Sequence, residues 1–442
     1  MVADVRLVLS LFVSLVGVST WAGNPGLTRK LDAKFAAECA GSYAFAKDQI
    51  IDIGPVGEME GDLVFLNSKT LREGRLHQIS EREFVAGPTL GLEEPVAIRV
   101  MFLRDHRGRI NAIRWTGDGI HNRIAGRIAP HKTESVEVRN GDVVLRGELL
   151  VPTMTGRHPA IVLAHGSGPA TRHAGVWNVF FVRLGMAVLS LDKRGAGDST
   201  GDFRTGSMDD LASDWLAGVT FLKSRGDIDP QRIGIHGSSQ AGWVVPLMAV
   251  RSSDIAFVIV RAGSGTNLAD MMLHEMEWSA REKGFRQQEI GEGMAAARLA
   301  MTMIARGAST EDYDAAMKPY RSRASWSDTF PVIDETPRGR NWIRLNAAYD
   351  SVDSVRRITV PILWFLADKD HNIPTEVSAP RLRQAFDAAG NRDATLVVLT
   401  NASHGFALTP TGNNKDFAKQ SHFVPGYWDT MEQWLQARGF TQ

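Results

Sequence analysis

This sequence of 442 residues contains a single cysteine, Cys39. A single thiol excludes an intrachain disulfide and any multi-cysteine metal site. An excess of charge of either sign is missing as well, because 50 Lys and Arg residues balance 50 Asp and Glu residues. Such a neutral chain offers no general electrostatic attraction to nucleic acid, so no nucleic-acid partner is expected. The remaining composition, 43% hydrophobic and 23% charged, is that of a globular protein.

Long apolar runs are also missing, apart from one near the amino terminus. Residues 7–18 read LVLSLFVSLVGV and follow Arg6, with the small residues Thr20 and Ala22 placed for cleavage. The run is too short to span a bilayer comfortably, although an uncleaved anchor or a buried helix are alternatives. The pattern predicts a signal peptide over residues 1–22. We therefore expect a periplasmic or secreted protein with no stable membrane insertion after cleavage.

The chain after this segment divides into two parts with different patterns. Residues 35–134 contain short apolar–polar runs typical of strands, such as 62–68, and a hairpin-like pair formed by 96–105 and 110–115. This region predicts a small, separate β-rich domain. No internal repeat is present, which argues against a propeller.

Residues 135–442 predict an α/β domain. Asn140-Gly141, between two strand-like runs, is a strong hairpin signal. Apolar strands then alternate with amphipathic helices, which indicates a mostly parallel central sheet. The expected strands are 160–165, 187–192, 232–237, 256–263, 361–368 and 395–400, and the expected helices are 173–185, 209–225, 240–251, 378–388 and 427–437.

One interval, residues 266–356, interrupts this alternation. It contains no convincing strand and is rich in alanine and methionine. We interpret it as a helical insertion that forms a lid over an apolar substrate. Alternatively, its methionines simply pack the helices against the core, as buried methionine commonly does. They are Met271, Met272, Met276, Met294, Met301, Met303 and Met317.

A serine motif follows the predicted strand 232–237. Residues 237–242 read GSSQAG and fit the pattern G-x-S-x-G/A with Ser239 as the serine. Choosing Ser238 instead would put His236 in the place of the first glycine. A sharp strand-to-helix turn strains the backbone of a nucleophile, and small neighbours avoid clashes there. Ser239 is therefore the predicted nucleophile.

A serine hydroxyl needs a base, and the base needs an orienting acid. On this type of sheet the chain order is Ser, then Asp or Glu, then His. Asp368 and Asp370 follow the strand 361–368, and His404 follows the last strand. Both loops lie at carboxyl ends of predicted strands, where α/β sheets bind their ligands.

The negative oxygen of a tetrahedral intermediate needs two N–H donors. One is the backbone N–H of Gln240, directly after the nucleophile. The other is expected in the loop His165-Gly166-Ser167-Gly168-Pro169, whose glycines let N–H groups turn toward a carbonyl. Ser167 is the favoured donor and Gly168 the neighbouring choice.

The ordered set of motifs resembles the α/β-hydrolase superfamily, and most closely bacterial HGSGP-type carboxylesterases with a small β domain ahead of the catalytic domain. The resemblance covers about residues 135–442. The motifs are HGSGP (165–169), LDKRGAGDSTG (191–201), IGIHGSSQAGW (233–243), LADKDHNIP (366–374) and SHGF (403–406). It implies an α/β-hydrolase fold, which agrees with the mostly parallel sheet, the helical lid and the amino-terminal β domain interpreted above.

The resemblance also implies roles for individual residues. The acid of the D-x-x-V/I-P motif corresponds to Asp370, and the nucleophile, base and oxyanion donor correspond to Ser239, His404 and Ser167. The sequence Asp192-Lys193-Arg194-Gly195 corresponds to a structural loop near the site. Two positions depart from the pattern, since Ala241 replaces the second glycine of the serine motif and Ala367 stands where glycine is usual.

No metal or cofactor is expected. His274-Glu275 lacks the second histidine of a zinc-binding helix. Residues 261–265, RAGSG, lack the lysine of a P-loop and the fingerprint of a dinucleotide site.

The favoured function is hydrolysis of a small-molecule carboxylic ester through an acyl-enzyme. Ser239 attacks, His404 transfers the proton and Asp370 orients the imidazole. A serine exopeptidase is an alternative, with Glu275 and Glu277 holding a substrate ammonium, and thioester or lactone hydrolysis would use the same residues. A non-catalytic binding protein on the same fold is less consistent with a complete set of roles.

Overall fold

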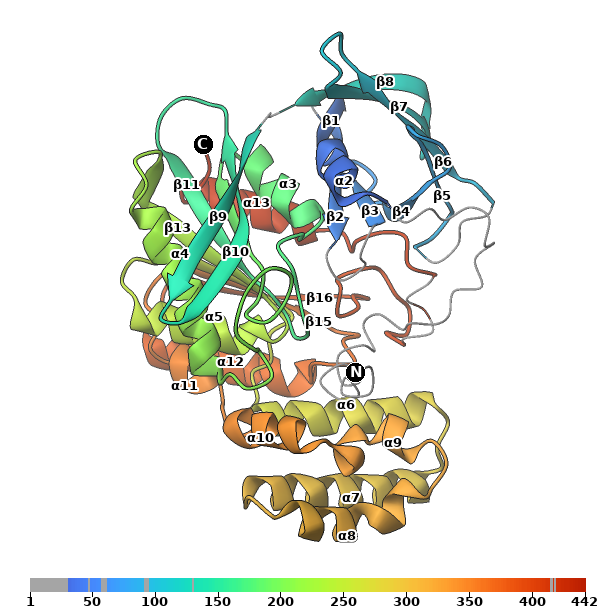
Figure 1. Ribbon diagram of the computed structural model, residues 1–442, viewed down its shortest axis with the longest axis vertical. Helices are drawn as coiled ribbons and strands as arrows, with labels where there is room; N and C mark the ends of the chain where they lie inside the picture. Colours follow the sequence, from blue (N-terminus) through green and yellow to red (C-terminus); the bar gives the residue numbers. More distant parts are fainter. Residues whose placement is uncertain are drawn as a thin grey trace.

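The computed structural model describes residues 31–442 apart from positions 47, 57–61, 91–94, 129–130, 414–415 and 417–418. The predicted signal peptide, residues 1–22, lies outside the described residues. Within them, no helix is both long and apolar enough to cross a lipid bilayer. The chain forms three parts: a barrel, a sheet flanked by helices, and a helical bundle at the end opposite the barrel (Figure 1).

Eight antiparallel strands form a closed barrel. Each strand pairs with the next along the chain, and β1 closes on β8 through pairing of Ser42 with Ile128. Large apolar side chains fill the interior, among them Phe65 and Trp115, whose rings meet edge to face at 5.1 Å. The barrel therefore has a hydrophobic core of its own. Helix α2 (Ala33–Cys39) precedes β1 (Gly41–Ala46), β2 (Gln49–Val56), β3 (Asp62–Asn67), β4 (Glu73–Gln78), β5 (Glu83–Ala86), β6 (Ile98–Arg104), β7 (Ile110–Gly117) and β8 (Ile120–Ile128).

The second part is built on an eight-stranded mixed sheet in the order β16-β15-β14-β13-β11-β12-β10-β9. The first six of these strands are parallel, and β10 and β9 continue the sheet antiparallel. The Asn140-Gly141 signal produces the β9–β10 hairpin, with Gly141 at a φ of 57°. The strands are β9 (His131–Asn140), β10 (Val143–Pro152), β11 (His158–Ala164), β12 (Ala187–Leu191), β13 (Ile228–Ser238), β14 (Phe257–Arg261), β15 (Ile362–Ala367) and β16 (Ala394–Leu399).

Helices cover the faces of this sheet, which explains why the central strands are apolar on both sides. Every residue of β11, β12 and β15 is buried. The covering helices are α3 (Val176–Arg183), α4 (Met208–Lys223), α5 (Ala241–Arg251), α12 (Thr375–Ala389) and α13 (Tyr427–Ala437). The alternation predicted from the sequence is thus present, whereas β9 begins before the boundary expected at Ser135.

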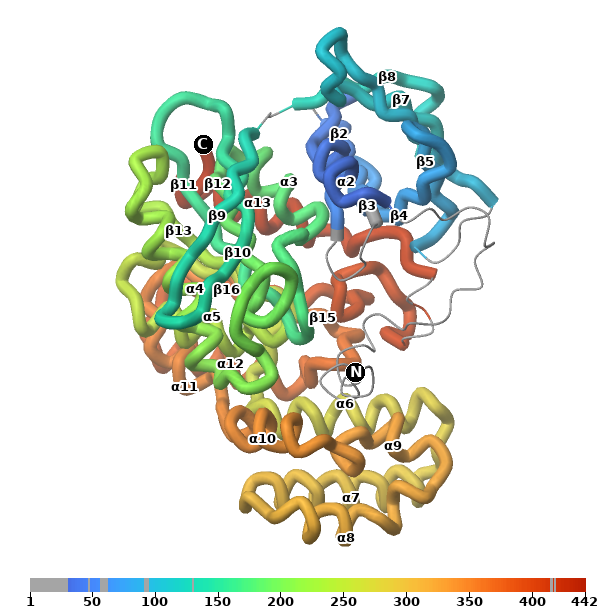
Figure 2. Tube along the Cα trace, viewed as in Figure 1, coloured from blue at the N-terminus to red at the C-terminus, as the bar shows by residue number. Residues whose placement is uncertain are grey.

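The barrel contacts the sheet part on two sides. Gly54 of β2 approaches the chain just before α3, where an added Cβ would lie 2.4 Å from the carbonyl oxygen of Gly175. The N–H of Gly175 also donates to the carbonyl of Pro55 at 2.7 Å. On the other side, the N–H of Glu73 donates to the carbonyl of Ser421 at 2.8 Å. Ser421 belongs to the long loop after β16, which lies between the barrel and the sheet (Figure 2).

The third part is the segment between β14 and β15, whose described residues form helices and no strand of the sheet. Six of its seven methionines are buried and Met303 is partly buried, so they pack the helices together. This is the packing role expected as the alternative to substrate contact. The helices are α6 (Leu268–Glu282), α7 (Gln287–Ala305), α8 (Thr310–Arg321), α9 (Trp326–Thr329), the 3-10 helix η2 (Pro331–Asp334), α10 (Pro337–Asn346) and α11 (Val352–Val355).

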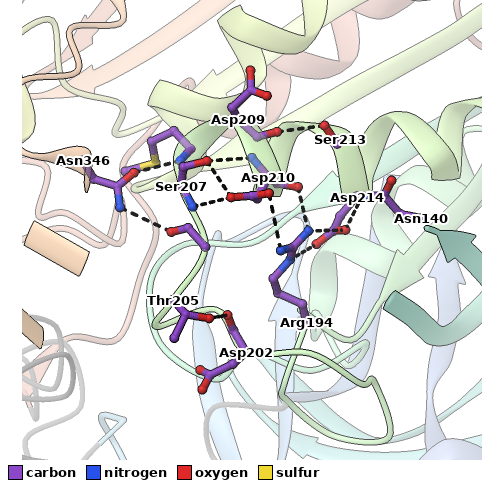
Figure 3. Close-up of polar contacts among 12 residues, drawn as sticks. Asn140, Arg194, Asp202, Thr205, Ser207, Asp209, Asp210, Ser213, Asp214 and Asn346 are labelled. Atoms are coloured by element: carbon purple, nitrogen blue, oxygen red, sulfur yellow. Dashed lines mark hydrogen bonds and ion pairs between the residues drawn. The ribbon is translucent and has the colours of Figure 1, made fainter. Parts of the chain in front are cut away.

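Asn346 at the end of α10 joins this segment to the start of α4 (Figure 3). Its side-chain oxygen accepts the N–H of Met208 at 2.8 Å, and its amide donates to the carbonyl of Gly206 at 3.3 Å. The first N–H groups of a helix have no partner inside the helix. Asn346, from a segment far away in sequence, supplies an acceptor for one of these N–H groups.

The loop after β12 is held by two separate ion pairs, one buried and one partly buried. Arg194 donates to both carboxylate oxygens of Asp214 on α4, at 2.6 and 2.8 Å, and Asn140 donates to the same carboxylate (Figure 3). Asp192 accepts instead from the backbone N–H and the guanidinium of Arg172. The charges of this loop therefore have structural partners.

Candidate active site

Ser239 lies in the turn between β13 and α5, as the motif predicts. Its φ is 54°, in the left-handed region that a residue with a side chain rarely adopts. The N–H of Ser239 donates to the carbonyl of Arg261 on β14 at 2.9 Å, and its carbonyl accepts the N–H of Gly242 at 2.7 Å. These bonds hold the strained conformation, which is typical of functional sites.

Close packing explains the small residues around Ser239. A Cβ added at Gly242 would lie 2.3 Å from the Cα of Gly263, so α5 can reach the loop after β14 only with glycine there. Gly263 of the RAGSG sequence thus serves this backbone approach. Ala241, the departure from the usual motif, is completely buried beside Gly237.

The structure brings the predicted base and acid to this serine. Nε2 of His404 lies 3.0 Å from Oγ of Ser239, and Nδ1 of His404 lies 2.7 Å from Oδ2 of Asp370. All three side chains are buried. His404 follows β16 and Asp370 follows β15, so neighbouring parallel strands deliver base and acid to one edge of the sheet.

The second oxygen of Asp370 is held by the backbone. Oδ1 accepts the N–H groups of Asn372 at 2.9 Å and Ile373 at 3.0 Å. Burial alone would raise the pKa of Asp370, but the adjacent His404, this hydrogen bonding and the nearby His371 hold that pKa below its usual range. The group is therefore an ionised acceptor for the imidazole.

Asp368, the other acidic residue of this loop, has a different partner. Its Oδ1 accepts the N–H of Ala402 at 3.2 Å, two residues before His404. Asp368 thus ties the acid loop to the base loop, whereas Asp370 contacts the imidazole. These contacts separate the roles of Asp368 and Asp370, which their positions in the loop alone leave open.

The loop after β11 lies against Ser239. A Cβ added at Gly166 would lie 3.4 Å from Cβ and 4.0 Å from Oγ of Ser239. Within the described residues, the N–H groups of Ser167, Gly168 and Gln240 donate to no protein acceptor. Free N–H groups from two segments beside a buried serine are the geometry that an oxyanion requires.

Two histidines next to the site, the half-buried His165 and the buried His236, are not positioned to be bases. Nε2 of His165 lies 2.7 Å from the carbonyl oxygen of Leu191, and burial lowers the pKa of His165 to about 4. Burial, with the charge of Arg261 and the neighbouring His165, lowers the pKa of His236 to about 3. Both rings are therefore neutral in the folded protein at neutral pH.

The low pKa of His236 predicts a pH-dependent stability. An unfolded histidine titrates near pH 6.5, so between about pH 6.5 and 3 the unfolded chain binds a proton that the folded chain does not. The stability linked to His236 is complete above that range and is lost as the pH falls through it. We expect His236→Leu to gain about 2 kcal/mol relative to wild type between pH 8 and pH 5.

Urea unfolding at both pH values measures this difference. The matched control is His106→Leu at an exposed hairpin tip, whose stability relative to wild type should not change with pH. An equal pH trend in the two variants would contradict the assignment to His236.

Sequence analysis missed two polar contacts at this site. Lys193, in the loop after β12, is buried, and its Nζ donates to the carbonyl of Gly166 and to Oε1 of Gln240, both at 2.6 Å. Glu275 on α6 accepts from Nδ2 of Asn372 at 2.6 Å, beside the acid loop. The only signal in the sequence was the presence of Lys193 within the 191–201 motif.

The carboxylates considered for a substrate ammonium have other partners. Glu275 holds Asn372, and Glu277 pairs with Arg281 one helical turn away. In the part of the chain that the structure describes, no group of three or more His, Cys, Asp or Glu side chains is arranged to hold a metal ion.

A family model described as the alpha/beta hydrolase family matches residues 161–419. The chain belongs to the alpha/beta hydrolase family. The matched range contains all the predicted site residues of this hydrolase, whereas the barrel lies outside it. The mixed sheet with its covering helices is accordingly the alpha/beta hydrolase fold.

The hydrolase is similar to several known proteins. It is 26% identical to the quorum-quenching protein AidA of Acinetobacter baumannii over 258 residues, 56% of this chain and 82% of that protein. It is 35% identical to the thiohydrolase aneE of Aspergillus aculeatus over 100 residues, 22% of this chain and 31% of that protein. A solved esterase of Pyrococcus furiosus matches with a TM-score of 0.43 and 17% identity, covering 70% of this chain and 91% of that one.

Proposed function

We propose that this protein is a serine hydrolase of small-molecule carboxylic esters. One observation carries the proposal: a strained serine, Ser239, contacts His404 at 3.0 Å, and His404 contacts Asp370 at 2.7 Å. A nucleophile, a base and an orienting acid in hydrogen-bond series are the requirements for acyl transfer through serine.

Each residue then has a defined step. His404 accepts the proton of the Ser239 hydroxyl as Oγ attacks the ester carbonyl, and the N–H groups of Gln240 and Ser167 stabilise the resulting oxyanion. Collapse of this intermediate breaks the ester bond, and His404 returns the proton to the departing alcohol. Water, deprotonated by His404, then attacks the acyl-enzyme, and His404 returns this proton to Oγ of Ser239 as the acid leaves. Asp370 keeps the Nδ1 proton of His404 in place throughout.

The helical segment 266–356 is part of the proposal as a lid that sets the substrate range. It is inserted between β14 and β15, whose carboxyl ends adjoin Ser239 and Asp370. Its helix α6 reaches the acid loop through Glu275 and Asn372. A segment anchored there can exclude water from the acyl group and limit its length.

The amino-terminal segment supports export as a further element of the proposal. Residues 7–18 are apolar, and small residues suitable for cleavage follow them. We propose that residues 1–22 are removed and that the hydrolase acts in the periplasm or outside the cell.

Hydrolysis of a thioester is the second candidate, because one relative is named a thiohydrolase. The same nucleophile and oxyanion donors would serve a thioester. The exopeptidase alternative has less support, since both Glu275 and Glu277 are engaged by other side chains.

A substrate panel tests the proposal. We expect the purified protein to hydrolyse p-nitrophenyl esters with a preferred acyl length, and thioesters of the same acyl group more slowly. Aminoacyl p-nitroanilides should be turned over least, and a fluorophosphonate should label Ser239. Faster turnover of anilides would assign a peptidase, and faster turnover of thioesters a thioesterase. Inactivity on all three substrates, with a folded and unlabelled protein, would leave a binding protein.

A further inference from the structure

Lys193 is a buried cation beside the predicted oxyanion donors. Only 1% of its surface is exposed. An ammonium is almost never buried so deeply without acceptors, because leaving water is costly. Two acceptors are the carbonyl oxygen of Gly166 and Oε1 of Gln240, each 2.6 Å from Nζ. Gly166 and Gln240 belong to the two segments that adjoin Ser239.

The contact with Gly166 acts directly on the N–H of Ser167. The carbonyl of Gly166 and the N–H of Ser167 are parts of the same peptide group, which is planar, and in a trans peptide they point in opposite directions. Fixing the carbonyl toward Lys193 therefore fixes the direction of that N–H. A charged donor on the carbonyl also polarises the peptide and strengthens its N–H as a donor. This contact favours Ser167 over Gly168 as the oxyanion donor.

The contact with Gln240 acts on the second donor. Gln240 directly precedes α5 as its N-cap residue, and its backbone N–H is the one predicted to face the oxyanion. Lys193 holds the Gln240 side chain through Oε1, which restrains this residue at the turn. Gly166 packs against Ser239 at the same place. One ammonium therefore joins the two segments that supply the two N–H groups.

We propose that Lys193 is a positioning residue of the oxyanion hole: it sets the distance and direction between the N–H groups of Ser167 and Gln240. It acts through these two residues. The inference rests on the proposed function, because an oxyanion hole has meaning only if Ser239 attacks a carbonyl. It predicts an effect on the transition state, where the oxyanion exists, and little effect on substrate binding.

Lys193→Met tests the proposal, since methionine has a similar length and lacks the charge and the donors. We expect kcat for the preferred p-nitrophenyl ester to fall about 10²-fold, as for loss of one oxyanion donor, with KM nearly unchanged. The inhibition constant of a matched trifluoromethyl ketone, which adds Ser239 reversibly to form a tetrahedral oxyanion, should rise in parallel. The inhibition constant of the corresponding secondary alcohol, which forms no oxyanion, should not change.

Two other variants complete the test. Lys223→Met, at the last residue of α4, removes an exposed lysine that pairs with Asp254 and should behave as wild type. Gln240→Met keeps the backbone N–H and removes one acceptor of Lys193, so it should lower kcat less than Lys193→Met, again without raising KM. Gln240→Met also serves if Lys193→Met fails to fold, which circular dichroism and urea unfolding would show.

Wild-type kcat in a folded Lys193→Met, a change confined to KM, or an unchanged ketone inhibition constant would overturn the inference. If Lys193→Met does not fold, wild-type kcat and ketone inhibition in Gln240→Met would do so. Failure of the proposed function has a different signature, because the wild-type protein itself would then neither turn over esters nor react with a fluorophosphonate.

Discussion

Ser239→Ala should lower kcat for the preferred ester by about 10⁴-fold or more, because loss of a catalytic serine removes the covalent route. The hydroxyl of Ser239 is the group that His404 contacts at 3.0 Å. Alanine keeps the small size required in this turn and leaves His404 and Asp370 in place. The variant should therefore fold as the wild type does, and substrate should still bind. Turnover is measured with the p-nitrophenyl series, and labelling with a fluorophosphonate.

The neighbouring serine provides a matched control. Oγ of Ser238 accepts from the guanidinium of Arg261, with the closer nitrogen at 2.7 Å, and has no contact with the imidazole. Ser238→Ala should therefore stay within about tenfold of wild-type kcat, since only a supporting hydrogen bond is lost. Turnover or labelling that persists in Ser239→Ala would show that Ser239 is not the nucleophile. Loss of turnover and labelling in Ser238→Ala alone would show the same.

Asp370→Asn should lower kcat by about 10⁴-fold, as removal of the carboxylate from such a series does when the imidazole is left in the wrong tautomer. The ionised carboxylate of Asp370 accepts the Nδ1 proton of His404 at 2.7 Å, which leaves Nε2 free to accept from Ser239. An amide that turns its NH₂ toward Nδ1 reverses this arrangement, and Nε2 then carries the proton. This is the orientation expected of the asparagine, because only in it does the amide oxygen still accept the N–H groups of Asn372 and Ile373.

The prediction is checked by measuring kcat and KM of Asp370→Asn across pH 6 to 9. The control is Asp368→Asn, which weakens the bond to Ala402 at 3.2 Å and leaves the acceptor of His404 intact. This control should lose about tenfold in kcat or less, since one hydrogen bond contributes about 1 kcal/mol. A larger loss in Asp368→Asn than in Asp370→Asn would exchange the roles of the two carboxylates.

Local sequence was sufficient to predict the turn at Ser239. A run of apolar residues, then Gly237, the two serines and small residues, permits one strand to enter a helix through a sharp turn. The hairpin at Asn140-Gly141 was predictable for the same reason, since Gly141 readily adopts the positive φ of the turn. That hairpin also adds β9 and β10 antiparallel to the sheet, so the sheet is mixed.

Pairing between distant strands was not predictable from these patterns. The strands of the amino-terminal region were expected. Closure of the barrel, however, depends on β1 meeting β8, which are the first and last strands of the barrel. The same limit applies to the methionines of the helical segment. Their spacing fits a helix face, but whether that face meets substrate or other helices depends on the packing of α6 to α10.

Residues adjacent in the chain were enough to predict the order of the strands and helices, the turn at Ser239, and the loops that carry Asp370 and His404, because each of these features depends on local sequence. The resemblance to α/β hydrolases pointed to Asp370 as the acid, but the contacts of the two carboxylates come from the tertiary structure: Asp368 accepts from Ala402, and Asp370 meets His404. The tertiary structure also shows that Lys193 donates hydrogen bonds to Gly166 and Gln240. Contacts between segments so far apart in sequence exist only once parallel strands bring their carboxyl ends to one edge of the sheet.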